Sequence, residues 1–172
     1  MEATVTTNED RAQEGRTALE HYERARAALG RTPNREEDVE LALATAAHVG
    51  DQQNDAQITV ASLRADRDEA VTVFLDLISN AFHDADGVVP PRMLIDTVLA
   101  EETMTPVDVT YTWSRLTPEA RRHAAFLAAV GQAAAACHDV YVQDLLEEGR
   151  AVFEDEAEEE RYKRLNSRRA GS

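Results

Sequence analysis

Cysteine, aromatic residues and chain-breaking residues are all scarce in this sequence. Cys137 is the single cysteine, so a disulfide within the chain is excluded and the redox compartment is left open. Aromatic residues make up 5% of the 172 residues, so a core has to be built from Leu, Val, Ile and Ala, and Ala has the highest helix propensity. Only 7 Gly and 5 Pro are present to separate short strands, which argues against an all-β fold.

Basic residues are also in short supply. The chain has 18 Lys and Arg against 33 Asp and Glu, which gives a formal net charge of −15. Binding to nucleic acid requires clustered Lys and Arg, and so does adsorption to an anionic membrane. We therefore expect no direct contact with nucleic acid and none with a membrane. A basic protein partner, or imitation of nucleic-acid charge, remains compatible with this balance.

Long apolar runs are absent as well. No segment approaches the roughly 20 apolar residues that a membrane-spanning helix needs. The first residues, 1–10, are polar and acidic and lack the basic and apolar regions of a signal peptide. These features predict a cytoplasmic protein.

The apolar residues that are present recur mostly at helical spacing. Val71, Phe74, Leu75, Ile78 and Phe82 are one example, and Asp66 with Glu69 forms a capping box before them. We predict an all-α fold, an irregular bundle of about six to eight helices. The predicted organisation is a polar N-terminal tail at 1–7, a helical domain at 8–153, and a charged helix end and tail at 154–172.

Two segments also carry a strand-like alternation. Residues 51–64 fit either a strand or a short helix. Residues 107–113 alternate as Val107, Val109, Tyr111 and Trp113, yet Thr105–Pro106 with Asp108 is a typical helix start. We favour a helix here because no clear strand elsewhere offers a partner.

The C-terminal part separates its charges along the chain. Glu154 to Glu160 is acidic except for Ala157, and basic residues follow from Arg161. Glu159 with Lys163 and Glu160 with Arg164 are favourable pairs at the four-residue helical spacing, so the helix is expected to project to about Leu165. The simpler interpretation is a solvated, self-paired helix end. The functional one is an interaction surface that includes Glu154, Asp155, Glu156, Glu158, Arg161 and Arg164.

A second set of residues suggests metal chemistry. His48, the adjacent His83 and Asp84, and the distant Asp139 resemble, in this order, the metal site of the all-helical HD-type phosphohydrolases. In that family a divalent metal activates water and polarises a phosphoryl oxygen. The residues after His83–Asp84 depart from the family pattern, since they read Ala85–Asp86–Gly87. A helix end stabilised by His83 is the simpler alternative.

A broader likeness involves the second half of the chain. Asp66–Arg67–Asp68, the segment from Trp113 to Leu116, Thr117–Pro118–Glu119 with Arg121, and the Ala-rich hairpin through His138–Asp139 to Val152 carry it. These features resemble the helical C-terminal region of the actinobacterial domain of unknown function 4192 family, over about half of the chain. The resemblance implies a helical fold and an actinobacterial or actinophage source, and it implies no activity.

Together these observations predict a non-enzymatic helical interaction or accessory protein, actinobacterial or phage-encoded, that uses no cofactor. Its partner would be another protein or further copies of the chain. One alternative is a metal-dependent HD-like phosphohydrolase that uses His48, His83, Asp84 and Asp139 with a divalent metal. Another is an acidic inhibitor that imitates DNA, which requires carboxylates along one elongated face.

Overall fold

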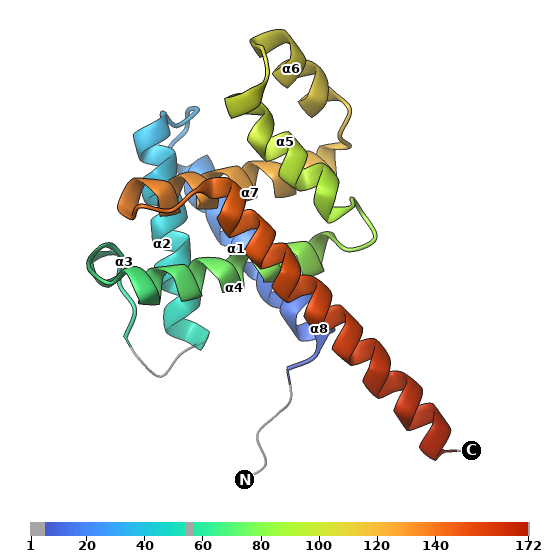
Figure 1. Cartoon of the computed structure of the whole chain (residues 1–172). Helices are drawn as coiled ribbons and strands as arrows, with labels where there is room; N and C mark the ends of the chain where they lie inside the picture. The colour runs from blue at the N-terminus through green and yellow to red at the C-terminus, as the bar shows by residue number, and fades with distance from the viewer. Residues whose placement is uncertain (1–5, 54–56, 172) are drawn as a thin grey trace.

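The computed structural model of the chain describes residues 6–53 and 57–171, and within them it is all helical (Figure 1). The described residues contain no strand, so the prediction of an all-α bundle of six to eight helices is confirmed. The helices are α1 (Asn8–Ala28), α2 (Arg35–Gln53), α3 (Val60–Ala65), α4 (Arg67–Ala85), α5 (Pro91–Thr103), α6 (Pro106–Ser114), α7 (Pro118–Cys137) and α8 (Val142–Ala170).

Local capping residues determine most of the helix starts. Asp66 accepts a hydrogen bond from the backbone N–H of Glu69, and Thr105 and Thr117 cap α6 and α7 in the same way. Each of these two threonines precedes a proline in the first turn, where a missing N–H costs nothing. The segment 107–113 is therefore helical, as predicted, and the short helix alternative holds for residues 60–65.

Helix α4 occupies the centre of the fold, between α1 and α8 (Figure 1). Phe74, Ile78 and Phe82 are at most 1% exposed and form much of its packing surface. Glycines permit the close approach of both neighbouring helices. A Cβ at Gly15 of α1 would lie 2.2 Å from the backbone oxygen of Asn80, and one at Gly149 of α8 would lie 2.3 Å from Ile78 Cγ2.

The other helices complete the body around this core. Helix α7 packs against α2, α4 and α5, and its Phe126, Leu127 and Val130 are fully buried. Helix α6 packs mainly against α5 and contains no buried residue, so the α5–α6 hairpin stands out from the body (Figure 1). Trp113 is half-buried against the core, while Val107 and Tyr111 are exposed.

Helix α8 begins within the body and leaves it. Leu145, Leu146 and Gly149 are buried, and Phe153 is the last buried residue. From Glu154 onward the helix continues to Ala170, beyond the expected end near Leu165, and extends away from the other helices (Figure 1). We call residues 154–170 the α8 extension. None of the helices in the described part of the chain combines the length and apolar character needed to cross a bilayer.

Candidate functional site

A polar junction joins α1, α4 and α8 at the base of the α8 extension. The carboxylate of Glu156 forms an ion pair with Arg11 and lies 3.3 Å from Nε2 of His83. The side chain of Asn8 donates to the backbone oxygen of Glu156 at 3.2 Å and accepts from Arg11 at 2.6 Å. Residues from both ends of the chain thus fix the direction in which the extension leaves the body.

His83 sits inside this junction rather than on the surface. Its ring packs edge-on against Phe153, with ring centroids 4.7 Å apart. Burial lowers the pKa of His83 below its ordinary value, and the neighbouring Glu156 carboxylate partly opposes that effect. A neutral ring is therefore favoured at neutral pH. In this form one ring nitrogen carries a proton and can donate to Glu156.

Asp84 points to a different set of partners, although it is adjacent to His83 in sequence. Its side chain is 5% exposed, accepts a hydrogen bond from Arg16 Nε at 3.2 Å and lies 3.9 Å from Nε2 of His123. Burial lowers the pKa of His123, and Asp84 works against this shift. Asp84 therefore links α4 to α1 and α7, and these contacts explain why a carboxylate is buried here.

The remaining two residues of the predicted metal set lie elsewhere. His48 stacks on His21 between α2 and α1, with centroids 4.5 Å apart, and Asp139 is exposed in the connection between α7 and α8. No group of three or more His, Cys, Asp or Glu side chains in the described residues could hold a metal ion. His48, His83, Asp84 and Asp139 thus make separate contacts, and the divalent metal remains an untested prediction.

The α8 extension carries the predicted interaction residues on several sides. Glu156 already pairs with Arg11 in the junction, and the carboxylate of Glu154 lies 3.6 Å from Nε of Arg150 on the same helix. Asp155, Glu158 and Arg161 are exposed. Arg164 lies 3.5 Å from Glu160. The residues of the set therefore differ in availability, which their positions in the sequence did not reveal.

A shallow groove of about 500 Å³ runs between the start of α1 and the extension. Carboxylate, basic and hydroxyl side chains all line this groove. The lining residues are Thr6, Thr7, Arg11, Glu156, Glu159, Glu160, Lys163, Arg164 and Ser167. The opposing charges largely pair with each other, as in the Glu159–Lys163 ion pair at 3.0 Å. This mixture gives no preference for an anionic or a cationic ligand.

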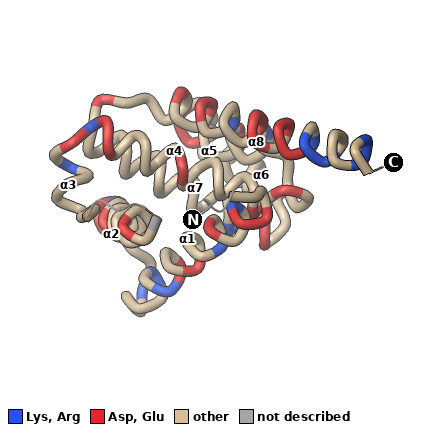
Figure 2. The backbone as a smooth tube through the Cα atoms, turned by 90° about the horizontal axis from the view of Figure 1, so that it is seen from below, with Lys and Arg blue, Asp and Glu red and all other residues tan. Residues whose placement is uncertain are grey.

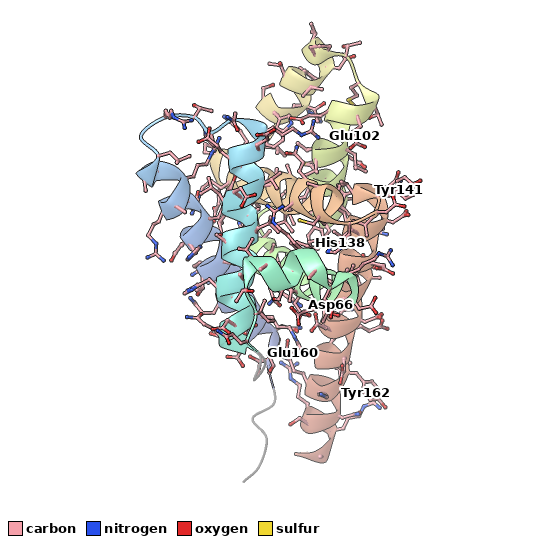
Figure 3. The ribbon with its side chains drawn as sticks, turned by 90° about the vertical axis from the view of Figure 1, so that its left-hand side faces the viewer. Asp66, Glu102, His138, Tyr141, Glu160 and Tyr162 are labelled. Atoms are coloured by element: carbon pink, nitrogen blue, oxygen red, sulfur yellow. The ribbon has the colours of Figure 1, made fainter. Side chains whose placement is uncertain are left out.

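The side of the extension that faces away from the groove exposes two large apolar side chains. Tyr162 is 65% exposed and Leu165 is 50% exposed. In Figure 3 Tyr162 points away from the body, whereas Glu160 points toward the start of α1. Neither residue belonged to the predicted set. Their three-residue spacing within a run of charges is the sequence signal that could have identified them.

Charge is distributed unevenly over the molecule (Figure 2). Acidic residues lie on most of the helices rather than along one face, and the far end of α8 is basic. The basic residues there are Arg161, Lys163, Arg164, Arg168 and Arg169. The arrangement therefore gives no support to imitation of a DNA phosphate backbone.

Comparison with known proteins returns no match: no family model fits the chain, and neither a curated protein nor a solved structure matches it. The resemblance to the domain of unknown function 4192 family therefore stays a prediction. Support for a function therefore comes from the sequence and structure of the chain alone.

Proposed function

We propose that this protein is a non-enzymatic interaction or accessory protein whose docking element is the α8 extension. The observation that carries the proposal is the exposed pair Tyr162 and Leu165 on a charged helix that the body does not cover. Binding hot spots are enriched in Tyr, Trp and Arg side chains.

The polar junction supports this proposal from the other side of the helix. Arg11 and His83 contact Glu156, and Phe153 is buried beside them. These contacts fix the direction in which the extension leaves the body. A preorganised helix loses less conformational entropy on binding than a mobile tail does. The junction thus has a positioning role, and the exposed face of the extension has the binding role.

Site-specific photo-crosslinking tests the proposal. A photoreactive phenylalanine analogue replaces Tyr162 in the full-length protein, and the same analogue replaces Tyr141 in a matched control. Tyr141 is also an exposed tyrosine, at 75%, but it lies at the start of α8. We expect a discrete adduct with another polypeptide chain in cells from position 162 and none from 141. Adducts from neither position, or equal yields from both, would contradict the assignment.

A further inference from the structure

We infer that the partner of the α8 extension is a second copy of this chain, paired through antiparallel contact of the two extensions. This inference rests on the proposed function, because it assigns an occupant to the same face of the helix. The charge sequence of that face and the position of Tyr162 within it support a second copy as the partner.

One face of the extension runs lengthwise opposite the groove. Asp155, Glu158, Tyr162, Leu165 and Arg169 follow at alternating spacings of three and four residues, which places them on one side of an α-helix. The buried Phe153 and the half-buried Glu156 and Glu160 lie on the other side. The body thus occupies one side of α8 and leaves this lengthwise face exposed.

The charge on this face is self-complementary about Tyr162. Asp155 lies seven residues before Tyr162, and Arg169 lies seven residues after it. Glu154 adds a second acid beside Asp155, and Arg168 adds a second base beside Arg169. A twofold interface requires a surface that complements itself, with residue i of one copy contacting residue j of the other and the reverse. A helix that is acidic at one end and basic at the other meets this condition only when the copies run antiparallel.

Antiparallel pairing centred on Tyr162 brings opposite charges together at both ends. Asp155 then faces the partner subunit's Arg169, and the contact is repeated by symmetry. The two Tyr162 rings meet in the middle beside Leu165. The ion pairs Glu159–Lys163 and Glu160–Arg164 lie on other sides of the helix.

The direction of the extension leaves room for the second copy. Because α8 leads away from the other helices, the two bodies would lie at opposite ends of the paired segment (Figures 1 and 3). The overlap spans about 20 Å at 1.5 Å per residue, which is short for a stable interface. We therefore expect a weak dimer that depends on concentration and on salt.

Sedimentation equilibrium of the full-length protein tests the inference. We expect a monomer–dimer equilibrium whose dissociation constant rises at least about tenfold between about 0.1 M and about 1 M salt, since salt screens exposed charges. Tyr162→Glu is expected to weaken the dimer by at least about tenfold, while the control Tyr141→Glu leaves it unchanged. A chain that stays monomeric up to millimolar concentration, or a dimer that Tyr162→Glu leaves intact, would overturn the inference.

Charge reversal provides the sharper test. The double variant Glu154→Arg/Asp155→Arg places a base at position 155, opposite the partner subunit's Arg169, and Arg168→Glu/Arg169→Glu places an acid at position 169, opposite the partner subunit's Asp155. Each variant alone should be monomeric, and an equimolar mixture should form heterodimers. Circular dichroism checks that both keep their helix content. Variants that dimerise alone, or a mixture that does not pair, would contradict antiparallel contact.

The outcomes separate this inference from the proposed function. An adduct at position 162 that joins two copies of this chain supports both. An adduct with a different polypeptide, together with a monomer in solution, overturns the second copy as partner and keeps the extension as the docking element. No adduct and no dimer would overturn both.

Discussion

Helix α4 and the α8 extension are both regular α-helix, but different forces hold them in that conformation. In α4 the residues Phe74, Ile78 and Phe82 are almost completely buried, and the helix packs against α1, α7 and α8. In the extension every residue from Arg161 to Ala170 is exposed. Tertiary packing therefore stabilises α4, whereas the extension depends on its continuity with α8 and on pairs such as Glu159–Lys163.

This difference indicates which residues the fold requires. Substitution of a side chain in α4 changes the core, so the identity of that residue is constrained by packing. From Arg161 onward the extension has no such constraint, and its basic residues and its exposed Tyr162 are not needed to bury apolar surface. Exposed apolar side chains that folding does not require often mark a binding surface.

Truncation of a side chain in each region gives the largest contrast. Phe74 is 1% exposed, and Phe74→Ala should lower the free energy of unfolding by about 3–5 kcal/mol because it leaves a cavity in the core. Leu165 is 50% exposed, and Leu165→Ala should change it by less than about 0.5 kcal/mol. Urea unfolding followed by circular dichroism measures both, at a protein concentration low enough to keep the chain monomeric. Similar losses of unfolding free energy in the two variants would contradict the difference between α4 and the extension.

The close approach of α1 to α4 predicts the next largest effect. Gly15→Ala places a Cβ 2.2 Å from the backbone oxygen of Asn80, so one helix must move, at a cost of about 1–3 kcal/mol. Gly171→Ala is the matched control at the end of the extension, where the nearest atom would lie at 3.5 Å. Its effect should be close to zero in the same urea experiment. A tolerated Gly15→Ala would show that the helices can separate without loss.

These glycines illustrate what sequence alone could and could not predict. Helix starts were predictable because a cap is local: the pairs Asn34 with Glu37 and Asp66 with Glu69 lie within one turn, and the structure contains both contacts. A glycine inside a helix, in contrast, looks only like a small loss of propensity. Its role at Gly15 and Gly149 depends on which helix crosses there, and this is a tertiary property.

The polar junction could not have been predicted for the same reason. Thr7 caps the first helix, and the next residue, Asn8, donates to the backbone oxygen of Glu156, 148 residues away. His83 lies in the last turn of α4, and its contact with Glu156 of α8 is likewise a tertiary property. The charged character of the extension was visible in the sequence. Which of its charges contact the body was not.

Protonation of buried histidines should also weaken the body more than the extension. Burial lowers the pKa of His21, His83 and His123 below the ordinary value of 6.5, so the unfolded chain binds protons more readily than the folded one does. The contribution of these histidines to the free energy of unfolding should thus be constant above pH 6.5 and should decline as the pH falls below 6.5. Urea unfolding at a series of pH values tests this.

The variant His123→Gln isolates one contribution to that decline. His123 faces Asp84 and Glu119 among the acids, and Arg122 among the bases. The variant should reduce the slope of stability against pH, whatever its effect on absolute stability. At lower pH the raised pKa values of Glu14 and Asp76, both caused mainly by burial, act in the opposite direction. An unchanged slope in the window just below 6.5 would contradict the role of His123.

The smallest effect is expected in the extension itself. Glu159→Gln removes the ion pair with Lys163 at 3.0 Å, which should slightly lower the local stability of the helix and leave the global unfolding transition unchanged. Hydrogen exchange of the backbone amides after Tyr162 would report this local loss, and about 1 M salt should abolish the difference from the wild type. Lys163→Gln is the matched change at the other end of the pair and should give the same result. A shift in the global transition would mean that the extension packs on the body, and the contrast with α4 would then fail.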